Sequence, residues 1–298
     1  MELRPRISIV IGIQKGQENL GAILSALEHY PGDDAELLIC FAKDDPVGDS
    51  LSSRFPLRPI EGRTGAPIPE LWRDGILAAQ GDRIAFLTAH CVPDDTWLTI
   101  ASTLDMDACV AYGGPIANSR DNDAADTAMH LLRYSRVTPP QTRHDLHDIA
   151  ADNAVYRRAD ILECEDLLPL GFWEPSYHAR FRQKNLSMKM EPDLLCTHRN
   201  RYSRSEFMLQ RREHGRAFGL ERARRAGSLK RWLLLLFSPA TFIVFGLKLS
   251  VNILKNPVLR RDYARSAPWL LVFLANWTIG ESLGYADGVL ELYRRPPK

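Results

Sequence analysis

The stretch Gly81-Asp-Arg-Ile-Ala-Phe-Leu-Thr-Ala-His-Cys-Val-Pro-Asp-Asp-Thr-Trp97 decides the fold of this 298-residue chain. It opens with a polar turn, and the apolar run Arg83–Leu87 that follows has the length of a buried strand. The polar triplet Thr88-Ala89-His90 ends that strand, and Pro93 precedes a helix start. Because ligands of α/β sheets bind at the carboxyl ends of strands, this triplet marks a candidate site.

Strands and helices alternate on both sides of this stretch. Short apolar runs predict strands, and apolar residues at helical spacing predict helices between them. We expect strands at residues 7–13, 36–41, 83–87, 108–112 and 186–190, and helices at residues 17–29, 68–80, 94–104, 125–134 and 174–184. This alternation predicts an α/β fold with a Rossmann-like, mostly parallel central sheet flanked by helices.

Charge divides the chain into two parts. Residues 1–198 carry 19 Lys and Arg against 30 Asp and Glu, a net charge of −11. Residues 199–298 carry 19 Lys and Arg against 7 Asp and Glu, a net charge of +12. The two parts therefore face different surroundings, and we expect one domain at residues 1–205 and a basic, apolar helical region at residues 206–298.

The basic region contains two strongly apolar runs. Trp232–Leu254 nearly reaches the roughly 20 residues that span a bilayer, but Ser238-Pro239 and Lys248 interrupt it. The second run, Trp269–Gly280, is too short to span. Cations beside amphipathic apolar helices suit a membrane surface with anionic headgroups, so we expect membrane association. A helical subdomain packed on the sheet or on another subunit is the alternative.

The five cysteines form no CxxC pair, as expected for free thiols in a reducing compartment. The N-terminal residues show no signal-peptide pattern and lead directly into the first expected strand. Together with the basic C-terminal region, these features predict a location at the cytoplasmic face of the cell membrane, peripheral or partly inserted.

Three segments accompany the opening stretch in a recognisable order: Ile7-Ser-Ile-Val-Ile-Gly-Ile13, Glu36-Leu-Leu-Ile-Cys-Phe-Ala-Lys-Asp-Asp45 and Leu71-Trp-Arg-Asp-Gly-Ile-Leu-Ala-Ala-Gln-Gly-Asp82. Over about residues 5–220 this series resembles the inverting family-2 glycosyltransferases of the GT-A fold. In that family the segments bind a nucleotide-sugar donor. The resemblance therefore implies donor contacts by Gly12, Asp44, Arg73 and Asp74.

The family carries an Asp-x-Asp motif where this chain has Thr88 and His90, so the motif is degenerate. Its carboxylates hold a divalent cation, which neutralises the charge that develops on the departing nucleoside diphosphate. The resemblance implies donor contacts by Thr88 and His90, and a cation, Mn²⁺ or Mg²⁺, held by His90 together with His198. Two alternatives stay open: metal-independent binding of the diphosphate by the arginines after His198, or a His90 that makes only a local hydrogen bond.

Two later segments, Asp152-Asn-Ala-Val-Tyr-Arg-Arg158 and Leu170-Gly-Phe-Trp-Glu-Pro175, resemble the acceptor side and the catalytic carboxylate of the family. The resemblance implies that Glu174 takes the proton of the acceptor hydroxyl while that oxygen attacks the anomeric carbon. It also implies acceptor contacts by Asn153 and Arg157. The alternative for Glu174 is an acid at a helix start, favoured there by the helix dipole.

Two side chains near Glu174 are further candidates for the acceptor. Trp173 precedes it and offers an apolar ring to a sugar face, and His178 lies one turn later on the same helix face. We expect both to contact the acceptor, with packing in the core as the alternative.

These observations favour a hexosyl- or related transferase that moves a sugar from a nucleotide-diphosphate donor to a glycan or lipid-linked acceptor with inversion, in glycan biosynthesis at the cell envelope. We expect a membrane surface as a partner and no nucleic acid. The degenerate motif favours the alternative, a non-catalytic GT-A-fold scaffold or partner subunit in a glycan or polysaccharide assembly pathway.

Overall fold

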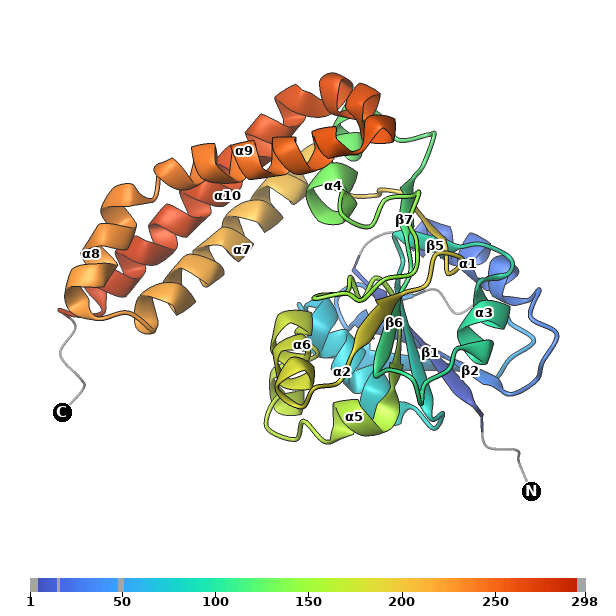
Figure 1. The fold of residues 1–298 in the computed structure, drawn as a ribbon. Coiled ribbons are helices and arrows are strands. Elements are labelled where there is room, and N and C mark those ends of the chain that lie inside the picture. The colour runs from blue at the N-terminus through green and yellow to red at the C-terminus, as the bar shows by residue number, and fades with distance from the viewer. Residues whose placement is uncertain (1–4, 15–16, 48–50, 294–298) are drawn as a thin grey trace. The chain divides into compact units, whose positions relative to one another are not determined.

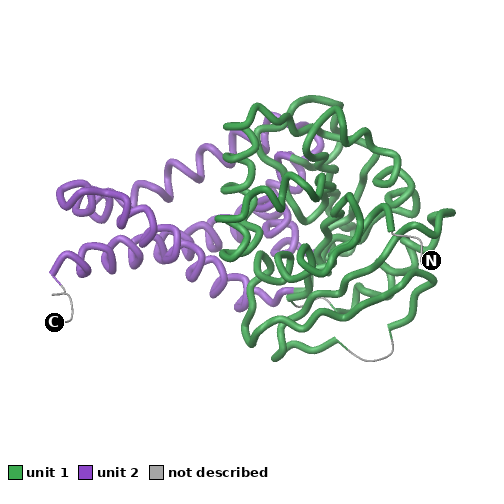
Figure 2. The backbone as a smooth tube through the Cα atoms, turned by 90° about the horizontal axis from the view of Figure 1, so that it is seen from below, with its two compact units in different colours: residues 1–121, 137–201 green, residues 122–136, 202–298 purple. Residues whose placement is uncertain are grey.

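The computed structural model describes residues 5–14, 17–47 and 51–293. The chain divides into two compact units, one of residues 1–121 and 137–201 and the other of residues 122–136 and 202–298 (Figure 2). Segment 122–136 therefore belongs with the C-terminal helices, whereas the sequence grouped it with the expected 1–205 domain.

The first unit is built on a seven-stranded sheet of order β3-β2-β1-β4-β8-β6-β9 (Figure 1). Its first four strands are parallel, β8 runs antiparallel to both β4 and β6, and β9 is parallel to β6. The sheet is thus mostly parallel, as predicted. The strand bounds are β1 Ile7–Ile13, β2 Ala35–Ala42, β3 Leu57–Gly62, β4 Arg83–Thr88, β6 Ala111–Gly113, β8 Asn153–Arg157 and β9 Met188–Met190.

Helices cover both faces of this sheet. In Figure 1, α2, α5 and α6 lie on one face, and α1 and α3 on the other. Because both faces are covered, β1 and β2 are buried at every position and read as continuous apolar runs. The helix bounds are α1 Leu20–Leu27, α2 Ile68–Ala78, α3 Trp97–Thr103, α5 Arg158–Leu162 and α6 Glu174–Gln183.

A second, three-stranded sheet has the order β5-β10-β7, with β10 antiparallel to β5 and parallel to β7. Its strands are three residues each: β5 Cys91–Pro93, β7 Ile116–Asn118 and β10 Cys196–His198. Strands this short show no hydrophobic period, so the sequence did not predict this sheet, and it also missed β3 and β8.

The second unit consists of helices, with bounds α4 Ala124–Tyr134, α7 Arg204–Arg224, α8 Ser228–Phe237, α9 Ala240–Lys255 and α10 Arg260–Leu290. Side chains of α4, α7, α9 and α10 share one apolar cluster, which explains why α4 belongs to this unit. Figure 1 shows α7 and α10 side by side. The pair runs parallel, since Phe207 meets Phe273 and Arg224 meets Glu291 further along both helices.

Helices α8 and α9 present apolar side chains to the outside. Each member of the following group is at least 62% exposed: Leu229, Leu236, Phe237, Ile243 and Leu247. In the described part of the chain, no helix alone has the length and apolar composition to cross a membrane; α8 and α9 meet both criteria only as a pair, bent by 65°.

Candidate functional site

The order of the strands reverses at β1, which has β2 and β3 on one side and β4 on the other. At such a point the carboxyl ends of neighbouring strands open a crevice, and α/β folds bind ligands there. β1 ends at Ile13 and β4 at Thr88. His90 Nε2 lies 3.2 Å from the Gln14 carbonyl oxygen, so the imidazole reaches from the end of β4 to the end of β1.

His198 comes to the same place from β10, where it pairs with Cys91 of β5. Its ring centroid lies 6.3 Å from that of His90, and both side chains are buried. The structure thus brings together the two histidines that the sequence paired. Among the described residues, no group of three or more His, Cys, Asp or Glu side chains could hold a metal ion. Because Mg²⁺ and Mn²⁺ favour oxygen ligands, two imidazoles do not fit the expected cation.

Asn19, just before α1, fixes the loops around these histidines. Its Nδ2 donates to the carbonyl oxygens of Ala89 at 2.8 Å and Arg199 at 3.2 Å. The Arg201 guanidinium donates to Asn19 Oδ1 at 3.1 and 3.2 Å, and Arg199 N donates to the His90 carbonyl at 2.8 Å. One buried amide therefore joins the loop after β4 to the loop after β10 and holds a cation beside them. The sequence did not point to Asn19.

A short segment ahead of β8 links the end of β4 to the start of α6. Thr88 Oγ1 donates to Asp152 Oδ1 at 3.1 Å, and Ala151 N donates to Glu174 Oε1 at 3.4 Å. Asp152 is buried. The Asp152 carboxylate therefore lies beside the end of β4, whereas the triplet Thr88-Ala89-His90 contains no carboxylate. Sequence reasoning did not select Asp152, although it opens the segment that was compared with the family's acceptor side.

Asn153 lies deeper than its neighbour. Its Oδ1 accepts from Trp97 Nε1 at 2.7 Å, and its Nδ2 donates to the carbonyl oxygens of Pro115 at 2.9 Å and Leu194 at 2.7 Å. The residue is fully buried. Here the amide ties α3 and two loops to the sheet, and its full burial leaves no surface for an acceptor to contact.

Arg157 lies at the other end of β8. It pairs with Arg83 at the start of β4, whereas Asn153 pairs with Leu87 near its end. Its guanidinium donates to the Asp160 carboxylate, and this hydrogen bond raises the pKa of Arg157. Nη1 also donates to the Met106 carbonyl at 2.9 Å. The structure therefore places Arg157 at the end of β8 that is away from Thr88 and His90.

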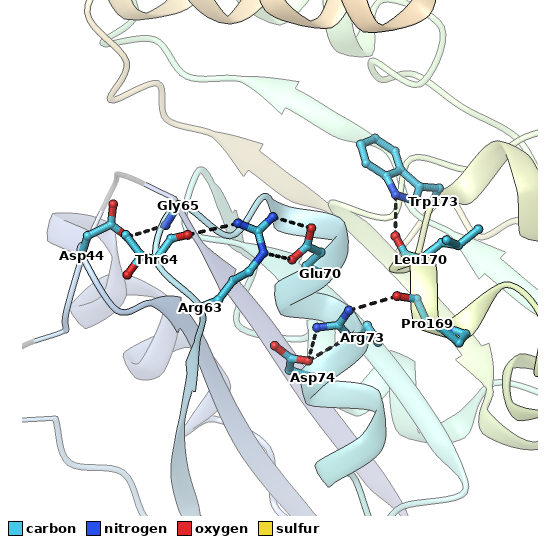
Figure 3. Close-up of polar contacts among 10 residues, drawn as sticks. All are labelled: Asp44, Arg63, Thr64, Gly65, Glu70, Arg73, Asp74, Pro169, Leu170 and Trp173. Carbon is cyan, nitrogen blue, oxygen red and sulfur yellow. Dashed lines mark hydrogen bonds and ion pairs between the residues drawn. The ribbon is translucent and has the colours of Figure 1, made fainter. Parts of the chain in front are cut away.

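Helix α6 begins at Glu174, with Pro175 in its first turn, and the helix dipole favours an acid there. The Glu174 side chain is half-buried. Trp173, directly before it, is 44% exposed, and its Nε1 donates to the Leu170 carbonyl at 2.9 Å (Figure 3). Carboxylate and indole therefore stand together at the accessible start of one helix.

His178 points into the core instead. The side chain is fully buried, with Nε2 2.9 Å from the Tyr156 hydroxyl and Nδ1 accepting from Ile149 N at 3.5 Å. Burial lowers the pKa of His178 to about 4, although Asp148 opposes that shift. The structure does not bring His178 to a position where an acceptor would contact it.

Asp44 follows β2 and faces the loop between β3 and α2. Its Oδ1 accepts from Gly65 N at 2.7 Å (Figure 3). Gly65 has a φ of 65°, a left-handed conformation that favours glycine. In the same loop Arg63 makes two hydrogen bonds of 2.7 Å to Glu70, and this contact lowers the pKa of the Glu70 carboxyl. Asp44 therefore orders the loop that rims this end of the sheet.

Arg73 and Asp74 form an ion pair of 2.7 Å on α2, and Arg73 also donates to the Pro169 carbonyl at 3.2 Å (Figure 3). They join α2 to the chain that leads into α6. Gly12 is buried in β1, and a Cβ there would lie 3.1 Å from Trp72 Nε1. Gly12 also pairs with Thr88 of β4, and its carbonyl oxygen accepts from Ala89 N at 3.1 Å, so the structure places Gly12 at the strand end beside the polar triplet.

The sequence matches no protein-family model and no curated protein. Among solved structures, the mannosyltransferase PcManGT from Pyrobaculum calidifontis, in complex with GDP-Man and Mn²⁺, is similar with a TM-score of 0.50 and 13% identity, over 94% of this chain and 88% of that chain. TarS residues 1–349 from S. aureus, in complex with UDP-GlcNAc, gives a TM-score of 0.47 and 14% identity, over 95% and 92%. The first likeness shows the fold alone: this chain shares the α/β fold of that mannosyltransferase.

Proposed function

We propose that this chain transfers a sugar from a nucleoside-diphosphate donor to a glycan or lipid-linked acceptor, with inversion at the anomeric carbon, in glycan biosynthesis at the cell envelope. One observation carries the proposal: hydrogen bonds run from Thr88 to Asp152 and from Ala151 to Glu174. They tie an accessible carboxylate to the strand end at which ligands bind in folds of this class. The fold shared with glycosyltransferases supports the same reading.

Glu174 is the base in this mechanism. Its carboxylate takes the proton of the acceptor hydroxyl while that oxygen forms a bond to the anomeric carbon. The bond from that carbon to the diphosphate oxygen breaks, and the nucleoside diphosphate leaves with the electron pair. A single displacement inverts the carbon and needs only one carboxylate. Trp173, exposed beside Glu174, offers its ring to the apolar face of the acceptor sugar.

The donor diphosphate lies near His90 and His198 in this proposal, and cationic side chains neutralise the leaving group. Arg199 and Arg201 follow β10, and Asn19 holds the guanidinium of Arg201 in place. Guanidinium groups suit phosphate oxygens because they donate two parallel hydrogen bonds. No step runs through a metal ion, since the two imidazoles do not fit Mg²⁺ or Mn²⁺.

The nucleoside occupies the side of the crevice formed by β2 and α2 in this proposal. Asp44 and the Arg73–Asp74 pair lie on that side, and each is already fixed by a hydrogen bond to the backbone of another segment. Ordered polar groups bind a base or ribose at lower entropic cost than mobile ones.

The test is transfer and hydrolysis measured with a panel of nucleotide sugars, with and without Mn²⁺. We expect turnover with one donor, and we expect Glu174→Gln to lower kcat by about 10²–10⁴-fold because the base is lost. Glu165→Gln is the matched control, since Glu165 is an exposed acid ahead of the same helix. Donor binding without turnover, unchanged by Glu174→Gln, would instead identify a non-catalytic scaffold.

We also propose that the helical unit rests on the cytoplasmic face of the cell membrane. Exposed apolar side chains of α8 and α9 support this, together with cations on the same helices such as Lys230 and Lys255. The full chain should float with vesicles that contain anionic lipid and less with neutral ones. Leu236→Asp should reduce flotation, whereas Leu77→Asp, an equally drastic change at an exposed leucine of α2, should not. Equal loss in both variants would contradict the proposal.

A further inference from the structure

The helical unit contains a pocket of about 530 Å³ between α4, α7, α9 and α10. Its walls are of two kinds, cationic and apolar. The residues that line it are Leu132, Arg133, Ser135, Arg136, Arg211, Phe245, Lys248, Leu249, Asn252, Phe273, Leu274 and Trp277. A volume of this size accommodates a small organic ligand.

Four cations line the pocket: Arg133 on α4, Arg136 just after α4, Arg211 on α7 and Lys248 on α9. No carboxylate is among the described residues that line it. Like charges gathered in a partly apolar cavity repel one another more strongly than they would in water. An anion placed among them would remove that repulsion, so the charge of the pocket selects an anionic ligand.

Arg211 is held in position for such a ligand. Its guanidinium carbon lies 4.9 Å from the Phe207 ring centroid and 5.6 Å from that of Trp277. Two aromatic rings therefore fix the plane of the group and restrict its motion. Burial and then the charge of Arg133 lower the pKa of Arg211 to about 10, and the same two causes lower the pKa of the buried His130 to about 3. The smaller of the two causes shows that the positive charge of Arg133 acts on both groups.

The apolar side of the pocket continues beyond the cations. Phe245 and Lys248 also line a second pocket, of about 610 Å³. Its apolar side is formed by α8 and α9 residues such as Leu233, Phe237 and Val244, and Arg222 of α7 and Glu281 of α10 lie on its polar side. The two pockets therefore adjoin along α9. A hydrocarbon chain that starts among the cations can extend past Phe245 along the apolar side of the second pocket.

We propose that these adjoining pockets bind a lipid phosphate, with the phosphate among Arg133, Arg211 and Lys248 and the hydrocarbon along Phe245 into the second pocket. The site lies within the helical unit and does not depend on sugar transfer by the first unit. It differs from contact with a bilayer surface, because it takes one lipid molecule with one phosphate.

Binding to the full-length protein tests this with decyl phosphate as the probe, below its micellar concentration, by calorimetry. Decanol and inorganic phosphate are the two comparison ligands. We expect decyl phosphate to bind at least about tenfold more tightly than either, because only it uses both kinds of wall. If inorganic phosphate binds as tightly, the pocket is a phosphate site and the lipid proposal fails; if decanol does, the cations play no part and it fails as well.

Variants locate the site. Lys248→Gln should weaken decyl phosphate binding several-fold and Arg211→Gln about tenfold, since each removes a charge-assisted hydrogen bond. Lys255→Gln, an exposed lysine on the same helix outside both pockets, is the matched control and should bind as the parent does. Because Lys248 is exposed, its replacement leaves the fold intact even if Arg211→Gln weakens packing on Trp277. Equal affinity in Lys248→Gln and Lys255→Gln would overturn the proposal.

Discussion

The packing inside the first unit differs from the packing inside the second. In the first, buried amides bond to the backbone of loops far away in the sequence, as Asn19 and Asn153 do. In the second, α7 and α10 approach backbone to backbone: a Cβ at Gly280 would lie 2.0 Å from the Arg212 carbonyl oxygen, and one at Gly219 would lie 2.3 Å from that of Glu281. A hydrogen-bonded loop can adjust when a side chain changes, whereas two touching helices cannot. A side chain at the site of the first unit can therefore be replaced while the fold remains. The helical unit tolerates fewer replacements, because α7 and α10 meet at glycines, which have no side chain.

The largest effect is expected for Gly280→Ala. Its methyl group would overlap the Arg212 carbonyl, so α10 must move away from α7, at a cost of about 3 kcal/mol. Urea denaturation of the full chain, followed by helical circular dichroism, measures the loss.

Gly246→Ala on α9 is the matched control for Gly280→Ala. The nearest atom to its new Cβ is Leu274 Cδ2 at 3.4 Å, and alanine is the better helix former by up to about 1 kcal/mol. That variant should therefore be neutral or slightly stabilised. If both variants unfold at the same urea concentration, backbone contact is not what holds the helical unit.

The glycine contact shows where sequence reasoning stops. Gly215 and Gly219 are four residues apart, and so are Gly280, Gly284 and Gly288. That spacing places small residues on one face of each helix and was available in the sequence as a signal. The sequence does not say which helices meet, because the contact joins residues about 65 positions apart. We predicted helical character for this region but not its packing.

The candidate site, too, could be predicted from the sequence only in part. The strand end at Thr88 and His90 could be predicted, because a long apolar run followed by polar residues is a local pattern. Asp152 and Asn19 could not, because their contacts cross 64 and 70 residues of chain. The burial of His178 likewise depends on Tyr156 of β8, a strand that the sequence did not predict.

A second prediction compares how the two units respond to acid. His178 in the first unit has a pKa of about 4 and His130 in the second about 3, both lowered mainly by burial from the usual 6.5. The unfolded chain therefore binds more protons below pH 6.5. Stability is full above that pH and falls as the pH drops toward 4, by about 1.4 kcal/mol per pH unit for each histidine. Thermal unfolding between pH 4 and 7 measures this.

His178→Gln should flatten the acid dependence of the first unit and His130→Gln that of the second, since glutamine does not titrate. His144→Gln, at an exposed histidine, is the control and should leave the dependence unchanged. An acid dependence that is identical in the parent and in both buried-site variants would show that folding does not lower the pKa of either histidine.

The smallest effect on stability, and the sharpest test of the comparison, is expected at Asp152. Asp152→Asn keeps an oxygen that can accept from Thr88, so the free energy of unfolding should change by less than about 1 kcal/mol. Asp152→Ala removes that oxygen and loosens the segment through which Ala151 orients Glu174. In this proposal Asp152 positions the base, so kcat should fall about tenfold in Asp152→Ala, with KM for the donor unchanged, and should recover in Asp152→Asn. If Asp152→Asn is as inactive as Asp152→Ala while both remain folded, the charge of Asp152 takes part directly, and the base role then belongs to Asp152 and not to Glu174.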